Sequence, residues 1–360
     1  MQTPSPNVVV IYDSLIARDG AAAALAGYFT VNQVPLEKFI TEGSFDAPVN
    51  VFCVNAGELE TTKQVKKVLE NCQNEALFVL PTHNSDGITR LRGITDAEFL
   101  VLPFNGNELR SLIKKALNRS VERSWNALHP QKRKALKEAV VCFENCFDQV
   151  QQGEPVPIEV IQDCCHHIRD AAELGDLNNW IDALDNHHDY SFRHSMFVCG
   201  TLSYFAHAIG IGGADLDQLT VGGLLHDIGK AKIPLEILDK PGKLNAHEWS
   251  IMKLHPVYSN DILADENGLD ADLVAMAVSH HERIDGAGYP SALSGAQIND
   301  QVRLTAIADV YSALIDKRAY KGSMTCEAAL DMMSSFEGHL DMDLLRSFRG
   351  FVLDQVHTLP

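Results

Sequence analysis

Short apolar runs alternate with helical stretches over the first third of the chain. Four runs are strand-like because they are apolar and rich in β-branched residues: NVVVIYD (7–13), VNVFCVN (49–55), ALFVLPT (76–82) and EFLVLPF (98–104). The stretches GAAAALAGYF (20–29), TKQVKKVLENC (62–72) and NELRSLIKKAL (107–117) fit helices. Unbroken apolar strands are typical of parallel sheets that are buried on both faces. The alternation therefore predicts an α/β domain with a parallel sheet between helices.

After about residue 118 the apolar residues recur every three or four positions, as in amphipathic helices. Two such stretches, at 130–150 and 158–174, are separated by GEPVP (153–157), because Gly and Pro interrupt helices. No long β-rich run recurs after residue 120, so the rest of the chain is predicted to be all-α. The predicted division is an α/β domain (1–120), a helical linker (121–180) and an all-α domain (181–360).

The balance of charge limits the kind of ligand. The chain of 360 residues holds 48 acidic and 30 basic residues, which gives a formal net charge of −18. Such a chain has no field that attracts a nucleic acid polymer, so an anionic substrate requires local cations or metal ions. No run approaches the roughly 18 apolar residues that span a bilayer, and the signal-peptide pattern is absent. We expect a cytoplasmic protein without membrane insertion, whose eight cysteines are thiols.

The order and spacing of elements in residues 7–117 resemble a bacterial response-regulator receiver domain, which has a flavodoxin-like fold. The resemblance implies an acidic pair after the first strand, a phosphoacceptor Asp after the third and a Lys after the fifth. The chain has Tyr12 and Asp13, then Asn55, then Leu102 at these places, and Asn cannot form an acyl phosphate. We expect a silent receiver-like domain that serves in dimerisation, in docking a signalling partner or in holding the second domain. A different small α/β module is the alternative.

Metal-ligand residue types also gather in the predicted linker. Cys142 and Cys146 are four residues apart, and CCHH occupies 164–167. Consecutive side chains on a helix point about 100° apart, so four of them cannot face one ion. We expect the cysteines to be buried thiols on apolar helix faces.

The strongest candidates for chemistry lie further along. His226 and Asp227 follow the apolar run VGGLL, and Lys230 comes three residues later. An imidazole and a carboxylate in a buried position are costly unless both are satisfied, and a metal ion would satisfy both. Five more residues of ligand type stand beside apolar helical runs: His194, His255, His280, His281 and Asp309. The set suffices for two metal ions bridged by one carboxylate, and such N and O ligands suit iron, manganese, zinc or nickel.

These residues stand in motifs that resemble the HD-GYP subgroup of the HD phosphohydrolase superfamily. In family order the motifs are His194, HDIGK (226–230), KPGKL (240–244), HP (255–256), HHERIDGAGYP (280–290), AD (308–309) and KRAYK (317–321). The similarity covers residues 182–348 and implies an all-α helical bundle. It implies a phosphodiesterase that hydrolyses the bacterial second messenger cyclic di-GMP to pGpG and often on to GMP. It also implies two divalent metal ions, with iron or manganese ahead of zinc or nickel.

The resemblance assigns a role to each matching residue. Asp227 would bridge the two ions; His194, His226 and Asp309 would complete one site, and His255, His280 and His281 the other. Two metal ions lower the pKa of a shared water enough for attack on phosphorus near neutral pH. Lys230 would oppose the charge that develops on the phosphoryl oxygens. Substrate would be bound through phosphate by Lys230, Arg318 and Lys321, and through the glycine-rich loop by Gly288 and Tyr289.

Some positions depart from the family pattern. Tyr190 stands where some members carry a Glu that holds a third metal ion, which favours a two-metal site. Phe197 replaces an Arg, Ser312 an Asp and Ala319 a Pro, and the last two bear on substrate affinity and on the second cleavage.

Two other functions stay open. One is a low-turnover cyclic di-GMP sensor or partner-docking module, and the other is an HD phosphohydrolase that acts on another nucleotide. Glu282 and Arg283, between the histidine pair and the glycines, have no assigned role.

Overall fold

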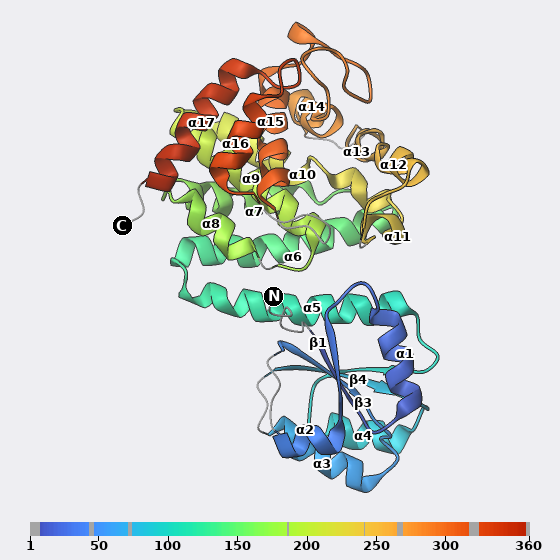
Figure 1. The fold of residues 1–360 in the computed structure, drawn as a ribbon. Coiled ribbons are helices and arrows are strands. Elements are labelled where there is room, and N and C mark those ends of the chain that lie inside the picture. Colours follow the sequence, from blue (N-terminus) through green and yellow to red (C-terminus); the bar gives the residue numbers. More distant parts are fainter. Residues whose placement is uncertain are drawn as a thin grey trace. The chain divides into compact units, whose positions relative to one another are not determined.

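The chain forms two compact units, Met1–Arg123 and Ser124–Pro360, which are described in turn. The computed structural model describes residues 8–42, 47–70, 74–185, 187–240, 242–264, 269–316 and 324–357. Figure 1 shows a sheet with helices in the first unit and an assembly of helices in the second. None of the described helices is both long enough and apolar enough to cross a membrane.

A five-stranded parallel sheet forms the centre of the first unit, as predicted. Its strands are β1 (Val8–Tyr12), β2 (Val31–Pro35), β3 (Val49–Cys53), β4 (Glu75–Leu80) and β5 (Glu98–Val101). Their order is β2-β1-β3-β4-β5, and every neighbouring pair is parallel. The apolar runs predict four of these strands. They do not predict β2, because VNQVP is an edge strand with mixed polar and apolar residues, only one of which is buried.

Helices cover both faces of this sheet (Figure 1). They are α1 (Leu15–Leu25), α2 (Leu36–Glu42), α3 (Leu59–Leu69), α4 (Ser85–Arg92) and α5 (Gly106–Ser124). Successive strand residues point to opposite faces. Val8 and Val10 accordingly join one core with α1 and α5, and Val9 and Ile11 join another with α2, α3 and α4. The sequence of β1 is apolar throughout because both of its faces are covered.

Polar residues at the carboxyl end of the sheet bond with one another. Asp13 accepts hydrogen bonds from the backbone N–H of Asn55 at 2.9 Å and from the hydroxyl of Thr61 at 2.8 Å. The side-chain oxygen of Asn55 in turn accepts from the N–H of Gly57 at 3.2 Å. Each carboxylate oxygen of Asp13 therefore has a donor from the chain itself.

The second unit is helical, as predicted, and its described residues contain only an isolated bridge between Asp285 and Ser294 in place of strands. Its described α-helices are α6 (Pro130–Gln152), α7 (Ile158–Ala172), α8 (Leu177–Leu184), α9 (Tyr190–Ala208), α10 (Gly213–Leu225), α11 (Leu235–Leu238), α12 (Ala246–Met252), α13 (His255–Leu263), α14 (Ala271–Ser279), α15 (Asp300–Ile315), α16 (Cys326–Ser334) and α17 (Met342–His357). Short 3₁₀-helices are η1 (Trp125–Ala127), η2 (Ile228–Lys232) and η3 (Gly295–Gln297). The predicted break at GEPVP separates α6 from α7, and α6 ends at Gly153 in the left-handed conformation, with φ 76°.

Helix α9 is the central helix of this unit. Every residue from Ser191 to Ala206 is buried, because the helix packs against α7, α8, α10 and α15. A Cβ atom at Gly223 of α10 would lie 2.9 Å from Cα of Cys199 in α9, closer than real Cβ atoms come. The backbones of α9 and α10 therefore meet directly, one turn before His226.

The cysteines of α6 and α7 are buried thiols, as predicted. The four side chains are at most 4% exposed: Cys142, Cys146, Cys164 and Cys165. Burial raises the pKa of Cys165 well above its ordinary value, so this thiol stays protonated. Among the described residues, no group of three potential metal ligands lies at this place.

Candidate metal centre

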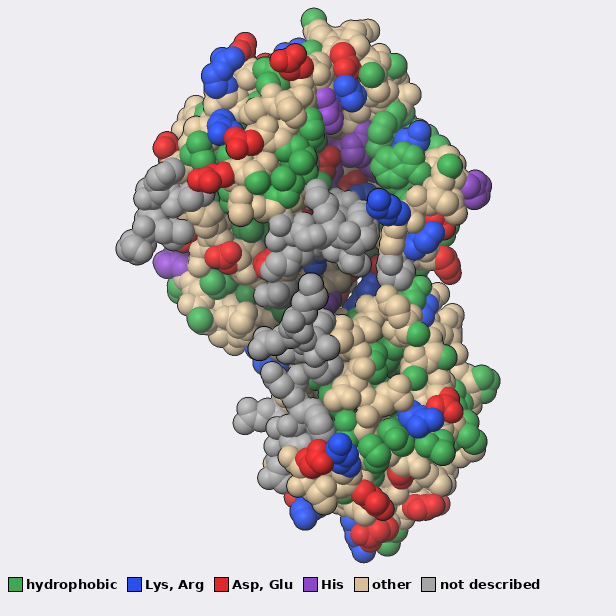
Figure 2. Space-filling model, in the orientation of Figure 1, with side chains coloured by type: hydrophobic (Ala, Val, Ile, Leu, Met, Phe, Trp, Pro, Cys, Tyr) green, Lys and Arg blue, Asp and Glu red, His purple; other side chains and the backbone are tan. Residues whose placement is uncertain are grey.

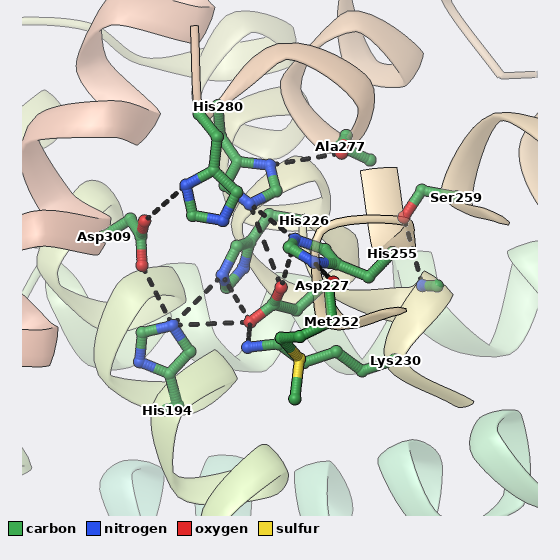
Figure 3. A network of polar contacts seen from close by, with 12 residues as sticks. His194, His226, Asp227, Lys230, Met252, His255, Ser259, Ala277, His280 and Asp309 are labelled. Carbon is green, nitrogen blue, oxygen red and sulfur yellow. Dashed lines mark hydrogen bonds and ion pairs between the residues drawn. The ribbon is translucent and has the colours of Figure 1, made fainter. Parts of the chain in front are cut away.

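Five helices bring the predicted ligand residues to one place in the second unit (Figure 3). His194 lies in α9, His226 caps α10 and is followed by Asp227, His255 begins α13, His280 and His281 follow α14, and Asp309 lies in α15. Figure 2 shows histidine side chains inside a hollow on one face of this unit. The candidate ligands thus meet where several helices begin or end. Because the chain changes direction at these ends, neighbouring side chains can converge there.

Gly229 lets α13 pack closely against the turn that carries Asp227. A Cβ atom at Gly229 would lie 2.0 Å from the carbonyl oxygen of His255, and the N–H of Gly229 donates to Oγ of Ser259 at 3.0 Å. The backbone after Asp227 therefore packs directly on the start of α13, which fixes the distance between Asp227 and His255.

The first group of candidate ligands comprises His194, His226 and Asp227. Nε2 of His226 lies 3.2 Å and Nε2 of His194 lies 3.4 Å from Oδ2 of Asp227, and the two Nε2 atoms are 3.4 Å apart. Asp309 joins this group, since its Oδ1 lies 3.0 Å from Nε2 of His194. All four side chains are buried. The ligand atoms of His194, His226 and Asp227 all lie within 4.8 Å of one another, close enough to share one ion.

The second group comprises His255, His280 and His281, whose ligand atoms lie within 4.8 Å of one another. Nε2 of His255 lies 3.2 Å and Nε2 of His280 lies 3.8 Å from Oδ1 of Asp227. Nδ1 of His281 lies 3.7 Å from Oδ2 of Asp309. Asp227 thus faces the first group with Oδ2 and the second with Oδ1, as a bridging carboxylate would.

Backbone carbonyls orient three of the imidazoles. The pairs are Nδ1 of His226 with the oxygen of Gly223 (2.9 Å), Nδ1 of His255 with Met252 (2.9 Å) and Nδ1 of His280 with Ala277 (3.1 Å). A carbonyl can only accept, so in each ring Nδ1 carries the proton. In the neutral form of each ring Nε2 is then unprotonated and faces the centre, which is the orientation that metal-ligating histidines commonly have.

Burial and neighbouring charges set the protonation of the centre. Burial lowers the pKa of His255 to about 3 and that of His281 to about 4. Burial opposes ionisation of Asp227, but the charge of Lys230 outweighs it and holds the pKa of Asp227 well below its usual range. Neutral imidazoles and ionised carboxylates are the forms in which these side chains bind metal.

The bonding of Asp227 shows that the residues present fit a metal ion. Its buried Oδ1 accepts no hydrogen bond from any residue that the structure describes. It faces Nε2 of His255, whose ring proton is on Nδ1, so two lone pairs oppose each other across 3.2 Å. A cation between them would turn this repulsion into two attractive contacts. The donor set of imidazole nitrogens and carboxylate oxygens suits iron, manganese, zinc or nickel.

Lys230 and Tyr190 border the first group. Nζ of Lys230 donates to Oδ2 of Asp227, the candidate bridging carboxylate. The ring of Tyr190 stacks on that of His194 with centroids 5.8 Å apart, and Nζ of Lys230 lies 5.9 Å from the Tyr190 centroid. An ammonium and an aromatic ring therefore stand beside the first group. Position 190 adds no carboxylate, and the number of metal ions stays a prediction.

The glycine-rich loop places Tyr289 against the second group. Its ring stacks on the ring of His281 with centroids 4.7 Å apart and 29° between the planes. A Cβ atom at Gly288 would lie 2.5 Å from Cα of Glu282. The packing of the loop on itself therefore requires glycine at position 288, and the predicted role of Gly288 in substrate binding stays a prediction.

Three residues named in the sequence analysis, Arg318, Ala319 and Lys321, lie outside the described residues. The phosphate contacts expected of Arg318 and Lys321 therefore stay predictions. Two other departures from the family pattern, Phe197 and Ser312, are buried in α9 and α15.

The sequence does not predict that two charged residues beside candidate ligands are buried. Arg193, next to His194, donates from Nε to Oδ1 of Asp316 at 2.7 Å and from Nη2 to Oδ2 at 3.3 Å. Glu282, next to His281, is 2% exposed. A charged residue inside the apolar run SFRHSMFV is the signal that could have indicated a buried partner for Arg193.

Known proteins resemble this chain over the region of the centre. Residues 178–344 match the model of a family described as HD domain. Cyclic di-GMP phosphodiesterase PA4108 of Pseudomonas aeruginosa is 36% identical over 160 residues, which are 44% of this chain and 39% of that protein. The 3'3'-cGAMP-specific phosphodiesterase 1 of Vibrio cholerae is 38% identical over 152 residues, 42% of this chain and 35% of that protein. The matches thus span well under half the length of these two curated relatives.

Two other proteins are similar over a larger share of the chain. A protein of Thermotoga maritima named cyclic di-GMP phosphodiesterase is 27% identical over 341 residues, 93% of this chain and 87% of that protein. Among solved structures, Bd1817, a HDG"Y"P protein from Bdellovibrio bacteriovorus, matches with a TM-score of 0.51 at 18% identity. That match covers 69% of this chain and 80% of Bd1817, and at this identity it concerns the fold alone. The helical unit therefore has an HD-type fold, and the candidate metal centre lies inside it.

Proposed function

We propose that the chain is a metal-dependent phosphodiesterase that hydrolyses cyclic di-GMP to pGpG in bacterial second-messenger signalling. The observation that carries the proposal is the position of Asp227 between two groups of histidines, with one oxygen toward each. The similarity to proteins named cyclic di-GMP phosphodiesterase supports the substrate. A second cleavage would give GMP. We assign this activity to the HD-GYP-like domain, residues 181–360.

Two bound divalent ions would lower the pKa of a water and oppose the charge that develops on the phosphoryl oxygens. The chain's own residues would do the remaining work. Asp227 stays ionised near neutral pH and would hold both ions, with Asp309 beside His194 completing the first group. Lys230 would turn from Asp227 to the phosphoryl group, where its fixed positive charge stabilises developing negative charge.

The test is turnover of cyclic di-GMP by protein that is purified anaerobically and analysed for metal. Iron or manganese is the expected metal, at two ions per chain. The double variant His226→Ala with Asp227→Ala removes two candidate ligands and should abolish both metal binding and turnover. Unchanged turnover in this variant would show that the assigned centre is wrong.

A second candidate substrate is 3'3'-cGAMP, which the similarity to the Vibrio cholerae phosphodiesterase favours. Turnover of both dinucleotides under the same conditions would rank them. Binding of cyclic di-GMP without turnover, in metal-loaded protein, would instead indicate a sensor.

We also propose that residues 1–120 form a silent receiver-like domain. The sheet order β2-β1-β3-β4-β5 supports the proposal, because it is the order of flavodoxin-like folds. The bonds of Asp13 to Asn55 and Thr61 support the loss of phosphorylation chemistry. We further propose the cytoplasm as the place of action, and a homodimer or a docked signalling protein as the role of this domain. Light scattering of the full chain would test the homodimer.

A further inference from the structure

Glu282 is a buried carboxylate beside the candidate metal centre, and its partners come from the far end of the glycine-rich loop. It is 2% exposed. Its Oε1 accepts a hydrogen bond from the N–H of Ser291 at 2.6 Å, and its Oε2 accepts one from the N–H of Leu293 at 2.9 Å. One side chain therefore closes the loop, because it binds residues nine and eleven positions further along the chain.

The loop between these points is packed tightly on its own beginning. A Cβ atom at Gly288 would lie 2.5 Å from Cα of Glu282 and 2.5 Å from the backbone nitrogen of Arg283, so the two backbone segments touch. Arg283 forms an ion pair with Asp285 at 2.6 Å, and the N–H of Asp285 donates to the carbonyl of Gly338 at 2.8 Å. The outer side of the loop is thus attached to the segment before α17.

Tyr289 is the side chain that this loop brings to the centre. Its ring lies on that of His281 at 4.7 Å between centroids, and its N–H donates to the carbonyl of His281 at 3.2 Å. The hydroxyl of a tyrosine can donate a hydrogen bond to an anionic ligand.

We propose that Glu282 is a positioning residue whose two bonds hold the loop of residues 283–293, so that Tyr289 lies flat on His281 and presents its hydroxyl to substrate. The substrate part of this inference rests on the proposed function, and the loop part rests on geometry alone. A carboxylate is required because both of its oxygens face N–H donors. A glutamine would turn its own NH₂ group toward one of those donors.

Glu282→Gln is the variant that tests this role. Hydrogen exchange of the amides of Ser291 and Leu293 should become about tenfold faster, because charge-assisted bonds are lost. The kcat/KM for cyclic di-GMP should fall by about tenfold, mainly through KM, with the metal content per chain unchanged. Tyr289→Phe should lower kcat/KM in the native chain and add little in the Glu282→Gln background, because both changes act through the same hydroxyl.

The matched control is Glu327→Gln, an exposed glutamate in the first turn of α16, which should change neither exchange nor kcat/KM. Should Glu282→Gln fail to fold, Glu282→Asp keeps the charge, shortens the reach by one methylene and should shift both readouts in the same direction. Unchanged exchange at the two amides would overturn the role of Glu282 in holding the loop. Fast exchange with normal kcat/KM would overturn its role in positioning Tyr289. Absence of turnover by the native chain would refute the proposed function, while the exchange measurement would still test the loop.

Discussion

Two aspartates that follow regular elements differ in how far the chain satisfies them. Asp13, after β1 in the first unit, has each oxygen bonded by a donor of the same unit, Asn55 or Thr61. Asp227, after α10 in the second unit, faces imidazole nitrogens, and its Oδ1 lacks a hydrogen-bond donor among the described residues. The first cluster is complete in itself, whereas the second would be completed by a cation. A polar cluster with an atom that lacks a hydrogen-bond donor is therefore a better candidate for a binding site than a cluster whose atoms are all paired.

The largest expected difference in turnover is between the variants in which each of these aspartates is replaced by asparagine. Asp227→Asn removes the charge that both histidine groups face, so cyclic di-GMP turnover should fall by at least about a thousandfold and metal content should drop. Asp13→Asn should leave turnover within about twofold, because the carboxylate only bonds within its own unit. Steady-state kinetics and metal analysis measure both. Comparable losses in the two variants would contradict the distinction.

The next largest difference should be in unfolding free energy, because the second unit holds a buried ion pair and the first unit an exposed one. Asp316 is fully buried and paired with Arg193, so Arg193→Met leaves an uncompensated charge and should cost about 3–5 kcal/mol of unfolding free energy in the helical unit. Lys38 and Glu42 form an exposed pair in the first unit, and Lys38→Met should cost at most about 0.5 kcal/mol. Urea denaturation of both variants gives the values. Equal costs would mean that water reaches the ion pair of Arg193 and Asp316 although both side chains are buried.

Acid should destabilise the two units differently once metal has been removed by a chelator. In the unfolded chain His255 takes up a proton near pH 6.5, but burial lowers its folded pKa to about 3. Stability from this residue is therefore complete above about pH 6.5 and falls as the pH is lowered, by about 1.4 kcal/mol per unit. The first unit holds a single histidine, His83, and its side chain is exposed. Denaturation at several pH values, with His255→Gln as the variant of reduced slope, measures the effect.

The smallest expected effect concerns phosphorylation. Incubation of the full chain with a small phosphodonor such as acetyl phosphate should leave residues 1–117 unmodified in mass spectra, since the proposed receiver-like domain has Asn55 at its acceptor position. A phosphoaspartate in this range would overturn the proposal that the first unit is a silent receiver-like domain.

Periodicity and residue type predict much of this molecule. Unbroken apolar runs predict β1, β3 and β4, which are mostly buried, and also β5, an edge strand with one buried residue. The HD and HH motifs predict the residues that meet in the second unit. Strand β2 escapes prediction because its sequence, VNQVP, mixes polar with apolar residues and forms no apolar run.

The supporting contacts of the centre cannot be predicted in this way. Glu282 bonds to backbone N–H groups, which every residue except proline carries, so the side chains of Ser291 and Leu293 give no signal. Arg193 finds Asp316 at a distance of 123 residues along the chain, which only the packing of α9 and α15 sets. Long-range polar contacts of this kind depend on the assembled fold.

The close contacts at Gly223 and Gly229 bear on how such a centre can be lost during divergence. An added methyl group at Gly223 would meet the backbone of α9, and one at Gly229 would meet the carbonyl of His255. Either change would part the helices that carry the ligands, although every histidine and aspartate would still be in the sequence. A lineage can therefore become inactive through steric crowding alone. An intact ligand motif in a sequence indicates descent from a metal-binding protein. Whether the protein can still bind metal also depends on the distance between the helix backbones that carry the ligands.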